Sequence, residues 1–135
     1  MNYELYTDGA VTKNPGGTAS YGFVLYADGK QLSFGYGIVG SSATMNNVLA
    51  EYYAVSQGIA EFMRIWDQPN SSLTIYNDSQ FVVSQIYKDR ILGPRLQQMK
   101  QYLDVKVVWV SREMNSQADD LAKRLRQLDC QRIPN

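Results

Sequence analysis

Four carboxylates in this chain stand where a metal-binding site is expected. Asp8 and Asp78 each follow a short apolar segment with the pattern of a β-strand. Because α/β proteins bind ligands beyond the carboxyl ends of their parallel strands, we expect both side chains to reach one edge of a sheet. Glu51 and Asp119 lie near the starts of two predicted helices, from which they can approach the same edge. The pattern therefore predicts a cluster of four acidic side chains.

Such a cluster needs a cation. Like charges at about 4 Å repel by several kcal/mol at an effective dielectric constant near 20. Oxygen ligands favour Mg²⁺, with Mn²⁺ as the alternative, and the chain contains no His to serve as a ligand or a general base. Two ions in one site would lower the pKa of an attacking water and stabilise the leaving oxygen of a phosphodiester. Phosphoryl transfer is the chemistry that these residues indicate.

Each carboxylate alone also has an ordinary structural explanation. Asp8 with Gly9 can form a turn, and Glu51 can be a surface charge of a helix. Asp78 can belong to a helix N-terminal cap, and Asp119 can interact with a helix dipole. Chance rarely places acids at two matching strand ends and at two helix starts in one small protein, so the combination favours the metal site.

The composition is that of one globular domain spanning residues 1–135. Hydrophobic residues make up 44% of the 135 residues, and the single Cys excludes an intrachain disulfide and a thiolate zinc cluster. The N-terminus lacks the pattern of a secretion signal, and no run of about 18 apolar residues suggests a membrane span. We therefore expect a cytoplasmic monomer that does not bind membranes.

The charges are balanced overall but unevenly distributed. The chain has 13 basic and 13 acidic residues, and its formal net charge is zero. Residues 88–135 carry ten Lys and Arg against six Asp and Glu, whereas residues 1–87 carry three against seven. If metal neutralises the acidic cluster, the remaining surface is net basic, which suits a nucleic-acid partner.

Hydrophobic periodicity predicts alternating strands and helices around these residues. The predicted strands cover residues 3–7, 20–27, 30–39, 73–76 and 105–110. The predicted helices cover residues 47–66, 81–87, about 95–103 and 115–128. In the first helix the expected inward stripe is Leu49, Tyr52, Tyr53, Ser56, Ile59, Ala60, Met63 and Trp66. This order of elements predicts one mixed α/β sheet in which the fourth strand lies parallel to the first.

Four segments of the chain resemble type 1 ribonuclease H, from Tyr3 to about Leu128. They read YTDGAVTKNPGGTASYGFVL, NNVLAEYYAVSQGI, YNDSQFVVSQI and WVSREMNSQADDLAKRL. They are similar to the family's T-D-G and N-P-G opening, its helix glutamate, its D-S-Q motif and its N-x-x-x-D-x-L-A ending. In the last segment Asn115 sets the register that selects Asp119 over Asp120.

The resemblance implies the fold, the reaction and the site. The implied fold is ribonuclease H-like α/β, with a five-stranded mixed sheet of order 3-2-1-4-5, an antiparallel first three strands and helices on both faces. The implied reaction is endonucleolytic hydrolysis of the RNA strand of RNA–DNA hybrids, giving 5′-phosphate and 3′-hydroxyl ends with two Mg²⁺ ions. Asp8, Glu51, Asp78 and Asp119 are the implied catalytic and metal-binding residues. The implied substrate-binding residues, whose side chains or backbone would read 2′-hydroxyls and phosphates, are Asn14, Gly16, Asn46, Asn47, Ser79 and Gln80.

Three departures from the family pattern leave questions open. One extra residue before Glu51 leaves open whether Asn46 or Asn47 contacts substrate. The His that many relatives carry before the last helix is absent, and either Arg112 or Glu113 substitutes for it, or no residue does.

The third departure concerns substrate affinity. The segment 87–98 is too short for the basic protrusion that some relatives use to grip the DNA strand, and the basic residues that remain there and just beyond are Lys88, Arg90, Arg95 and Lys100. Since phosphate contacts supply much of the affinity for nucleic acids, we expect weak substrate binding.

Two other functions fit parts of the pattern. A non-catalytic nucleic-acid-binding module can use the same fold, because fold alone does not determine function. Another metal-dependent nuclease of the superfamily would share the carboxylates. The presence of all four acids and of the D-S-Q and N-P-G motifs favours the hybrid nuclease over both.

Overall fold

A five-stranded sheet organises the computed structural model, which describes residues 1–131, with side chains described through residue 124. Its strands are β1 (Asn2–Val11), β2 (Thr18–Ala27), β3 (Lys30–Ser41), β4 (Ser72–Asn77) and β5 (Asp104–Trp109). The strand order is β3-β2-β1-β4-β5, with β1, β2 and β3 antiparallel and β4 and β5 parallel to β1. Both the order and the directions confirm the prediction.

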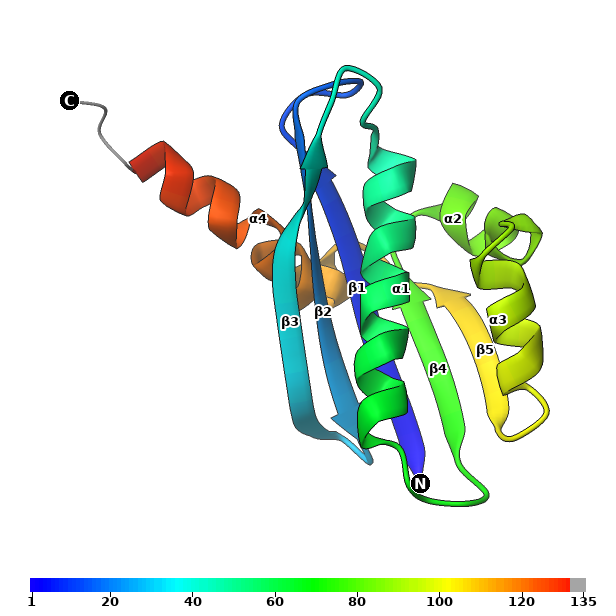
Figure 1. Ribbon diagram of the computed structural model, residues 1–135. Coiled ribbons are helices and arrows are strands. Elements are labelled where there is room, and N and C mark those ends of the chain that lie inside the picture. Colours follow the sequence, from blue (N-terminus) through cyan, green and yellow to red (C-terminus); the bar gives the residue numbers. More distant parts are fainter. Residues whose placement is uncertain (132–135) are drawn as a thin grey trace.

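Helices cover both faces of this sheet, as predicted. They are α1 (Asn47–Ile65), α2 (Gln80–Gln85), α3 (Leu92–Met99) and α4 (Ser116–Gln131), with short 3₁₀ turns η1 (Ile86–Lys88) and η2 (Glu113–Asn115). Figure 1 shows α1, α2 and α3 in front of the sheet and α4 behind it. Across residues 1–131, every helix is too short or too polar to cross a lipid bilayer.

The main hydrophobic core lies between the sheet and the helices α1 and α3. Alternate residues of β1 and β4 point to this side, because side chains of a strand alternate between its faces. Its largest fully buried side chains include Leu5, Leu25, Ile59, Phe62, Leu73, Ile75, Ile86 and Leu96. This packing fixes α1 and the central strands, which carry most of the predicted site.

The buried face of α1 differs from the predicted one. The buried residues are Ala50, Glu51, Ala54, Val55, Gly58, Ile59 and Phe62. Leu49, Tyr53 and Met63, which were expected inside, are 48%, 38% and 43% exposed. The small residues Ala50, Ala54 and Gly58 face the sheet because larger side chains would prevent the helix from lying so close to it. A Cβ on Gly58, for example, would lie 2.8 Å from a methyl carbon of Leu5. The helix is therefore rotated relative to the expectation, and Glu51 lies on its buried face.

Strand β1 also extends beyond its predicted end. The Asp8–Gly9 pair was expected to begin a turn, but it continues the strand to Val11. Antiparallel pairing with β2 explains the extension, since Asp8 is paired with Gly22 and Gly9 with Tyr21. A strand partner can hold an Asp-Gly sequence extended although its local preference is for turns.

The third helix starts and ends earlier than the predicted range of about 95–103. Helix α3 runs from Leu92 to Met99, so Gly93 and Pro94 lie in its first turn. Pro94 is tolerated there because the first backbone N–H groups of a helix have no partner within the helix. The carboxylate of Asp89 accepts hydrogen bonds from the N–H groups of Ile91 and Leu92, at 3.1 and 2.9 Å, and stabilises this start.

Candidate metal and nucleic-acid site

The register of the central strands brings Asp8 and Asp78 together. Strands β1 and β4 are paired in parallel from Asn2 with Ser72 to Thr7 with Asn77. Asp8 and Asp78 are the next residues on each strand. The two aspartates therefore share one position along the sheet, at the end where α/β proteins bind ligands.

Glu51 reaches this position from α1. Its carboxylate accepts a hydrogen bond from the backbone N–H of Gly9, and Asp8 Oδ1 accepts from the same N–H at 3.0 Å. The contact requires the backbones of α1 and β1 to lie very close. A Cβ on Gly9 would lie 2.3 Å from the carbonyl carbon of Ala50 and 2.5 Å from the nitrogen of Glu51.

We expect Gly9→Ala to damage both stability and the site. The added methyl would meet backbone atoms, which can move only with the whole helix, so the cost in free energy of unfolding should be about 2 kcal/mol or more. Gly29→Ala is the matched control, because Gly29 has open space and only its φ of +83° is unfavourable. Thermal denaturation of both variants measures the difference. Equal melting temperatures would contradict the close approach of α1 to β1.

Asp119 joins the site from α4 on the other face of the sheet. It lies in the first turn of that helix, and its carboxylate pairs with Lys123 Nζ at 3.1 Å, one helical turn further on. It lines the same cavity as Asp8, Glu51 and Asp78. The neighbouring Asp120 is exposed and lines a different cavity, beside Leu121 and Arg124. The four predicted carboxylates therefore converge.

The cavity that holds them is open and mostly polar. Oxygen atoms of Asp8, Glu51 and Asp78 all lie within 4.8 Å of one another. The cavity has a volume of about 540 Å³. Its lining is Asp8, Gly9, Ala10, Val11, Asn47, Val48, Glu51, Asp78, Ser79, Arg112, Asp119 and Lys123.

Mutual repulsion and burial shift the pKa values of this cluster. Burial, then the charge of Glu51 and hydrogen bonds with Glu51 and Asp119, raise the pKa of Asp8 far above its ordinary range. Burial raises the pKa of Glu51 to about 7, against the hydrogen bonds with Asp8 and the Gly9 N–H that lower it. At Asp119 partial burial is outweighed by the hydrogen bond with Asp8 and the pairing with Lys123, so its pKa is lowered. No Lys or Arg side chain that the structure describes is among the causes of the pKa shifts of Asp8 and Glu51, so the protein does not balance their negative charge with a positive one.

The donor set fits a hard divalent cation. Three carboxylates offer only oxygen ligands, and their separation lets one ion contact all of them. Among the described residues, the two ion pairs join Arg64 to Glu61 and Lys123 to Asp119, so none neutralises Asp8, Glu51 or Asp78. A divalent cation is therefore the group that these residues are suited to hold.

Two buried amide side chains, Asn77 and Asn115, form hydrogen bonds with Thr7, the residue before Asp8. Asn77 donates through Nδ2 to the carbonyl oxygen and to Oγ1 of Thr7, at 3.2 and 3.1 Å, and Asn115 Nδ2 donates to the same carbonyl at 2.9 Å. These bonds tie the residues preceding Asp8 and Asp78 to the start of α4. In addition, Trp109 Nε1 donates to the backbone oxygen of Asp78 at 3.0 Å, which fixes that residue to the end of β5.

The predicted substrate residues fall into two groups. Asn47 and Ser79 line the carboxylate cavity. Asn46 is the N-cap of α1 and accepts from the N–H of Leu49 at 3.0 Å, so its oxygen serves the helix.

The remaining predicted substrate residues, Asn14, Gly16 and Gln80, are not part of the cavity lining. Asn14 accepts from the N–H of Asn47 at 3.4 Å, and the N–H of Gly16 donates to the oxygen of Met45 at 2.7 Å. Both bonds hold the 12–17 loop against the start of α1. Gln80 is exposed at the first position of α2.

The segment that lacks the family's His places Arg112 in the cavity. Arg112 lines it, whereas Glu113 is exposed on η2 and does not appear in the lining. Lys123 and Asn77 belong to the site but were not predicted from the sequence. Lys123 lies four residues after Asp119, a spacing that pairs side chains on a helix, and Asn77 is a polar residue at the end of a buried strand; both were available signals.

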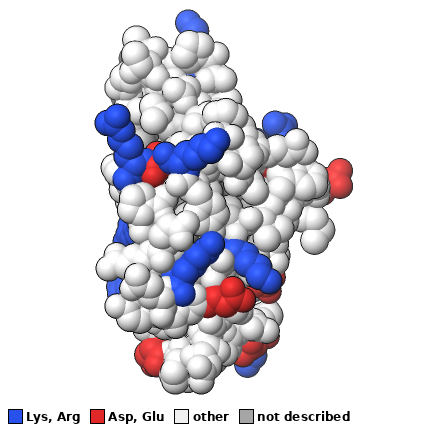
Figure 2. Space-filling model, turned by 90° about the vertical axis from the view of Figure 1, so that its right-hand side faces the viewer, with Lys and Arg blue, Asp and Glu red and all other residues white. Residues whose placement is uncertain are grey.

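Basic side chains also lie outside the carboxylate cavity, on the side of the molecule that carries α3 and β5. Figure 2 shows Lys and Arg side chains on the side that carries α3 and β5, with Asp and Glu among them. Lys88, Arg90 and Lys100 are exposed and Arg95 is half-buried. Lys100 lies over the ring of Tyr87, 4.5 Å from its centre. The surface is basic, but α3 is short and gives no long projection.

Fold and site together define a class of protein. A 3-2-1-4-5 sheet with carboxylates clustered within β1 and just after β4 is the arrangement of the ribonuclease H-like nucleases. A model of the RNase H family matches residues 1–127 of the chain. The chain therefore belongs to the RNase H family.

Solved structures of known proteins share this fold. LC11-RNase H1 in complex with an RNA/DNA hybrid matches with a TM-score of 0.69 and 22% identity, over 93% of this chain and 99% of the other. The N-terminal RNase H domain of rv2228c from Mycobacterium tuberculosis matches with a TM-score of 0.73 and 22% identity, over 92% and 98%. The RNase H domain of PFV matches with a TM-score of 0.65 and 18% identity, over 93% and 94%.

Proposed function

We propose that this protein is a metal-dependent endonuclease that hydrolyses the RNA strand of RNA–DNA hybrids, leaving 5′-phosphate and 3′-hydroxyl ends. The observation that carries the proposal is the convergence of Asp8, Glu51 and Asp78 within 4.8 Å in an open cavity. Family membership and the fold shared with LC11-RNase H1, which was solved with a hybrid, support the same conclusion.

Asp8, Glu51, Asp78 and Asp119 are the proposed metal ligands, with Mg²⁺ favoured and Mn²⁺ as the alternative. Two bound ions would supply activation of the attacking water and stabilisation of the leaving oxygen. Asp8 lies between α1 and α4 and interacts with carboxylates from both, so it is the residue best placed to serve both ions. Gly9, through its N–H, holds Glu51 in orientation for this role.

Asn47 and Ser79 are the proposed contacts to the substrate within the cavity. Asn47 offers an amide with both donors and an acceptor, which suits a 2′-hydroxyl or a base edge. Because Asn46 caps α1, we assign the substrate role to Asn47. Asn14 and Gly16 act by holding the neighbouring loop, and Gln80 extends the contact surface along α2.

Arg112 is the proposed substitute for the family's loop His. Arg112 lines the cavity, and its guanidinium can hold a phosphate oxygen, although it cannot accept a proton. Lys123, which pairs with Asp119, adds a second positive charge at this rim. Both charges favour the negative charge that develops on the phosphate during hydrolysis.

We expect Arg112→Ala to lower kcat by about 10- to 100-fold, because a positive charge beside the reacting phosphate is lost. Glu113→Gln, the matched neighbour, should stay within about twofold of the wild type, since Glu113 lies outside the cavity. Steady-state cleavage of a labelled hybrid measures both variants. The assignment of Arg112 fails if Glu113→Gln is the more damaged enzyme.

Side-by-side cleavage of end-labelled RNA–DNA hybrid, duplex RNA and duplex DNA tests the proposed function. Each substrate is incubated with Mg²⁺, Mn²⁺ or EDTA. We expect cleavage of the RNA strand of the hybrid, with either metal and not with EDTA. Binding of hybrid without cleavage under all three conditions would indicate a non-catalytic module, and cleavage of duplex DNA would indicate another nuclease of the superfamily.

A further inference from the structure

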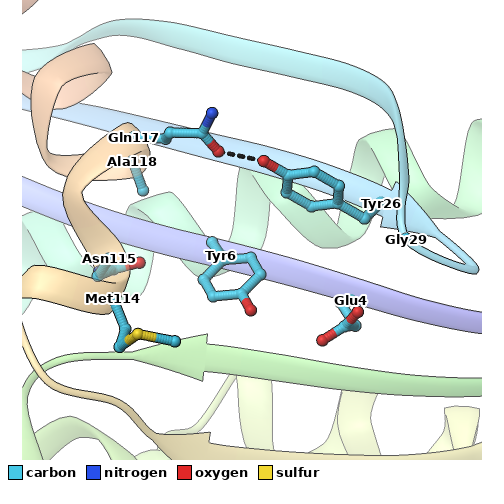
Figure 3. Close-up of a pocket in the computed structure, with 8 residues that line it drawn as sticks. All are labelled: Glu4, Tyr6, Tyr26, Gly29, Met114, Asn115, Gln117 and Ala118. Carbon is cyan, nitrogen blue, oxygen red and sulfur yellow. Dashed lines mark hydrogen bonds between the residues drawn. The ribbon is translucent and has the colours of Figure 1, made fainter.

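A second cavity, of about 280 Å³, lies on the α4 face of the sheet beside the metal site. Glu4, Tyr6 and Asp8 alternate to the same face of β1. The start of α4 reaches Asp8 but leaves Glu4 and Tyr6 half-buried, and Figure 1 shows the part of the sheet nearest the N-terminus without a helix behind it. Figure 3 shows the cavity, which is lined by Glu4, Tyr6, Tyr26, Gly29, Met114, Asn115, Gln117 and Ala118.

One wall of this cavity carries a buried acceptor that has no partner. The side chain of Asn115 is fully buried, and its Nδ2 donates to the oxygen of Thr7 at 2.9 Å. Its Oδ1 makes no hydrogen bond within the described part of the chain. Figure 3 shows this oxygen directed to the side where Tyr6 lies. Because buried acceptors are almost always satisfied in native proteins, the atom indicates that a donor belongs in the cavity.

The middle of the cavity is aromatic and held in place. The ring of Tyr6 stacks on the ring of Tyr76 at a centroid distance of 4.6 Å. It also makes a T-shaped contact with the ring of Tyr26 at a centroid distance of 5.8 Å. The hydroxyl of Tyr26 donates to Oε1 of Gln117, which fixes that ring to the start of α4. An ordered Tyr ring offers a negative π-face, which attracts cations and covers alkyl chains.

The far end of the cavity carries a negative charge. Figure 3 shows Glu4 on the opposite side of Tyr6 from Asn115. Burial, and after it the charge of Glu4, raise the pKa of the Tyr6 and Tyr76 hydroxyls, which lie beside this carboxylate. Glu4 takes part in neither of the two ion pairs found among the described residues. The cavity thus presents a carboxylate, an aromatic surface and an amide oxygen in sequence.

We propose that this cavity binds an elongated organic cation of the alkyldiamine class, with one ammonium at Glu4, its methylene chain across Tyr6 and an N–H donor at Asn115. Each feature of the wall favours such a ligand, because both ends accept hydrogen bonds and the surface between them suits methylene groups. Anions are disfavoured by Glu4, and neutral apolar ligands would leave Asn115 unsatisfied.

Titration of the full-length protein with putrescine, followed by NMR amide shifts, tests the proposal. Saturating Mg²⁺ is present throughout, so that the amine does not compete for the metal carboxylates. We expect saturable shifts at Glu4, Tyr6, Tyr26 and Asn115. Glu4→Gln should weaken binding by about tenfold, the usual effect of losing a charge-assisted hydrogen bond.

Three controls decide the chemistry and the place of binding. Asp67→Asn removes an exposed acid that is not part of the cavity lining and should leave the affinity unchanged. Tetramethylammonium, which has no N–H donor, and butanediol, which has no charge, should both bind more weakly than putrescine. The proposal is overturned if putrescine causes no saturable shifts, if the shifts centre on Asp8 and Asp78, if Asp67→Asn weakens binding as much as Glu4→Gln, or if either comparison compound binds as tightly.

Discussion

Replacing Asp8 with Asn should reduce hybrid cleavage at least about 10³-fold, since several kcal/mol of transition-state stabilisation depend on a bound metal ion. Asp8 has carboxylate neighbours from both α1 and α4, so its loss affects every metal position in the site. The measurement is single-turnover cleavage of a labelled hybrid with saturating Mg²⁺. Turnover like that of the wild type would refute the assignment of the metal site.

The same substitution should make the metal-free fold more stable. Asn keeps the shape of the side chain and replaces a carboxyl group whose charged form is disfavoured by burial and by Glu51 and Asp78, so we expect a gain of about 1 kcal/mol, or about 3–5 °C in melting temperature. Added Mg²⁺ should raise the melting temperature of the wild type and affect Asp8→Asn much less. Thermal denaturation in EDTA and in Mg²⁺ separates a loss of chemistry from a loss of folding.

The raised pKa values give this stability a definite pH dependence. The folded metal-free protein binds protons at Asp8 and Glu51 more tightly than the unfolded chain does, so the contribution of these two residues to the free energy of unfolding falls as the pH rises. The fall should begin near pH 4, the ordinary range of carboxyl groups, and continue past about pH 7, the pKa of Glu51, because the pKa of Asp8 is raised further. It should be smaller in Asp8→Asn. Denaturant unfolding of the wild type and Asp8→Asn in EDTA at several pH values measures it. A difference in stability between the two proteins that does not change with pH would contradict the repulsion.

Asp119→Asn should lower activity by about 10- to 100-fold, and Asp120→Asn should have little effect. The two residues are adjacent and chemically identical, which makes them a matched pair. Asp119 lies in the carboxylate cavity and shares a hydrogen bond with Asp8, whereas Asp120 is exposed and lines another cavity. Cleavage rates of the two variants at the same Mg²⁺ concentration provide the comparison. The reverse ranking would show that the register of α4 is wrong.

Steric contact, rather than hydrophobicity, decided the orientation of α1. Periodicity predicted the helix and nearly its bounds, but the large side chains of Leu49, Tyr53 and Met63 were assigned to the core. The sheet instead meets a stripe of small residues, because Gly9 and Leu5 lie too close to α1 for larger ones. A single sequence shows which residues are apolar, but it does not show how near the neighbouring backbone comes.

The roles of Asn46 and Asn47, the two asparagines before Glu51, also became clear only in the tertiary structure. Both fit the family pattern equally well, so their roles were left open by the sequence. The cap at the start of α1 uses the oxygen of Asn46, and the fold places Asn47 along the cavity. Likewise, Arg112 and Glu113 were equal candidates until η2 oriented one toward the cavity and the other toward solvent.

By itself, the sequence predicted the order and type of the elements, which follow from periodicity. The motifs shared with ribonuclease H, which are local in the chain, predicted the strand order of the sheet and the four candidate carboxylates. The tertiary structure alone decided that Asp8 lies within an extended β1, that Thr7 and Asn77 form the last pair before the aspartates, and that an unpartnered oxygen of Asn115 faces a second cavity. The first depends on the pairing of Asp8 with Gly22 in β2, and the other two depend on contacts between residues 70 or more positions apart, such as Asn77 with Thr7 and Asn115 with Thr7. All of these contacts exist only once the sheet has formed.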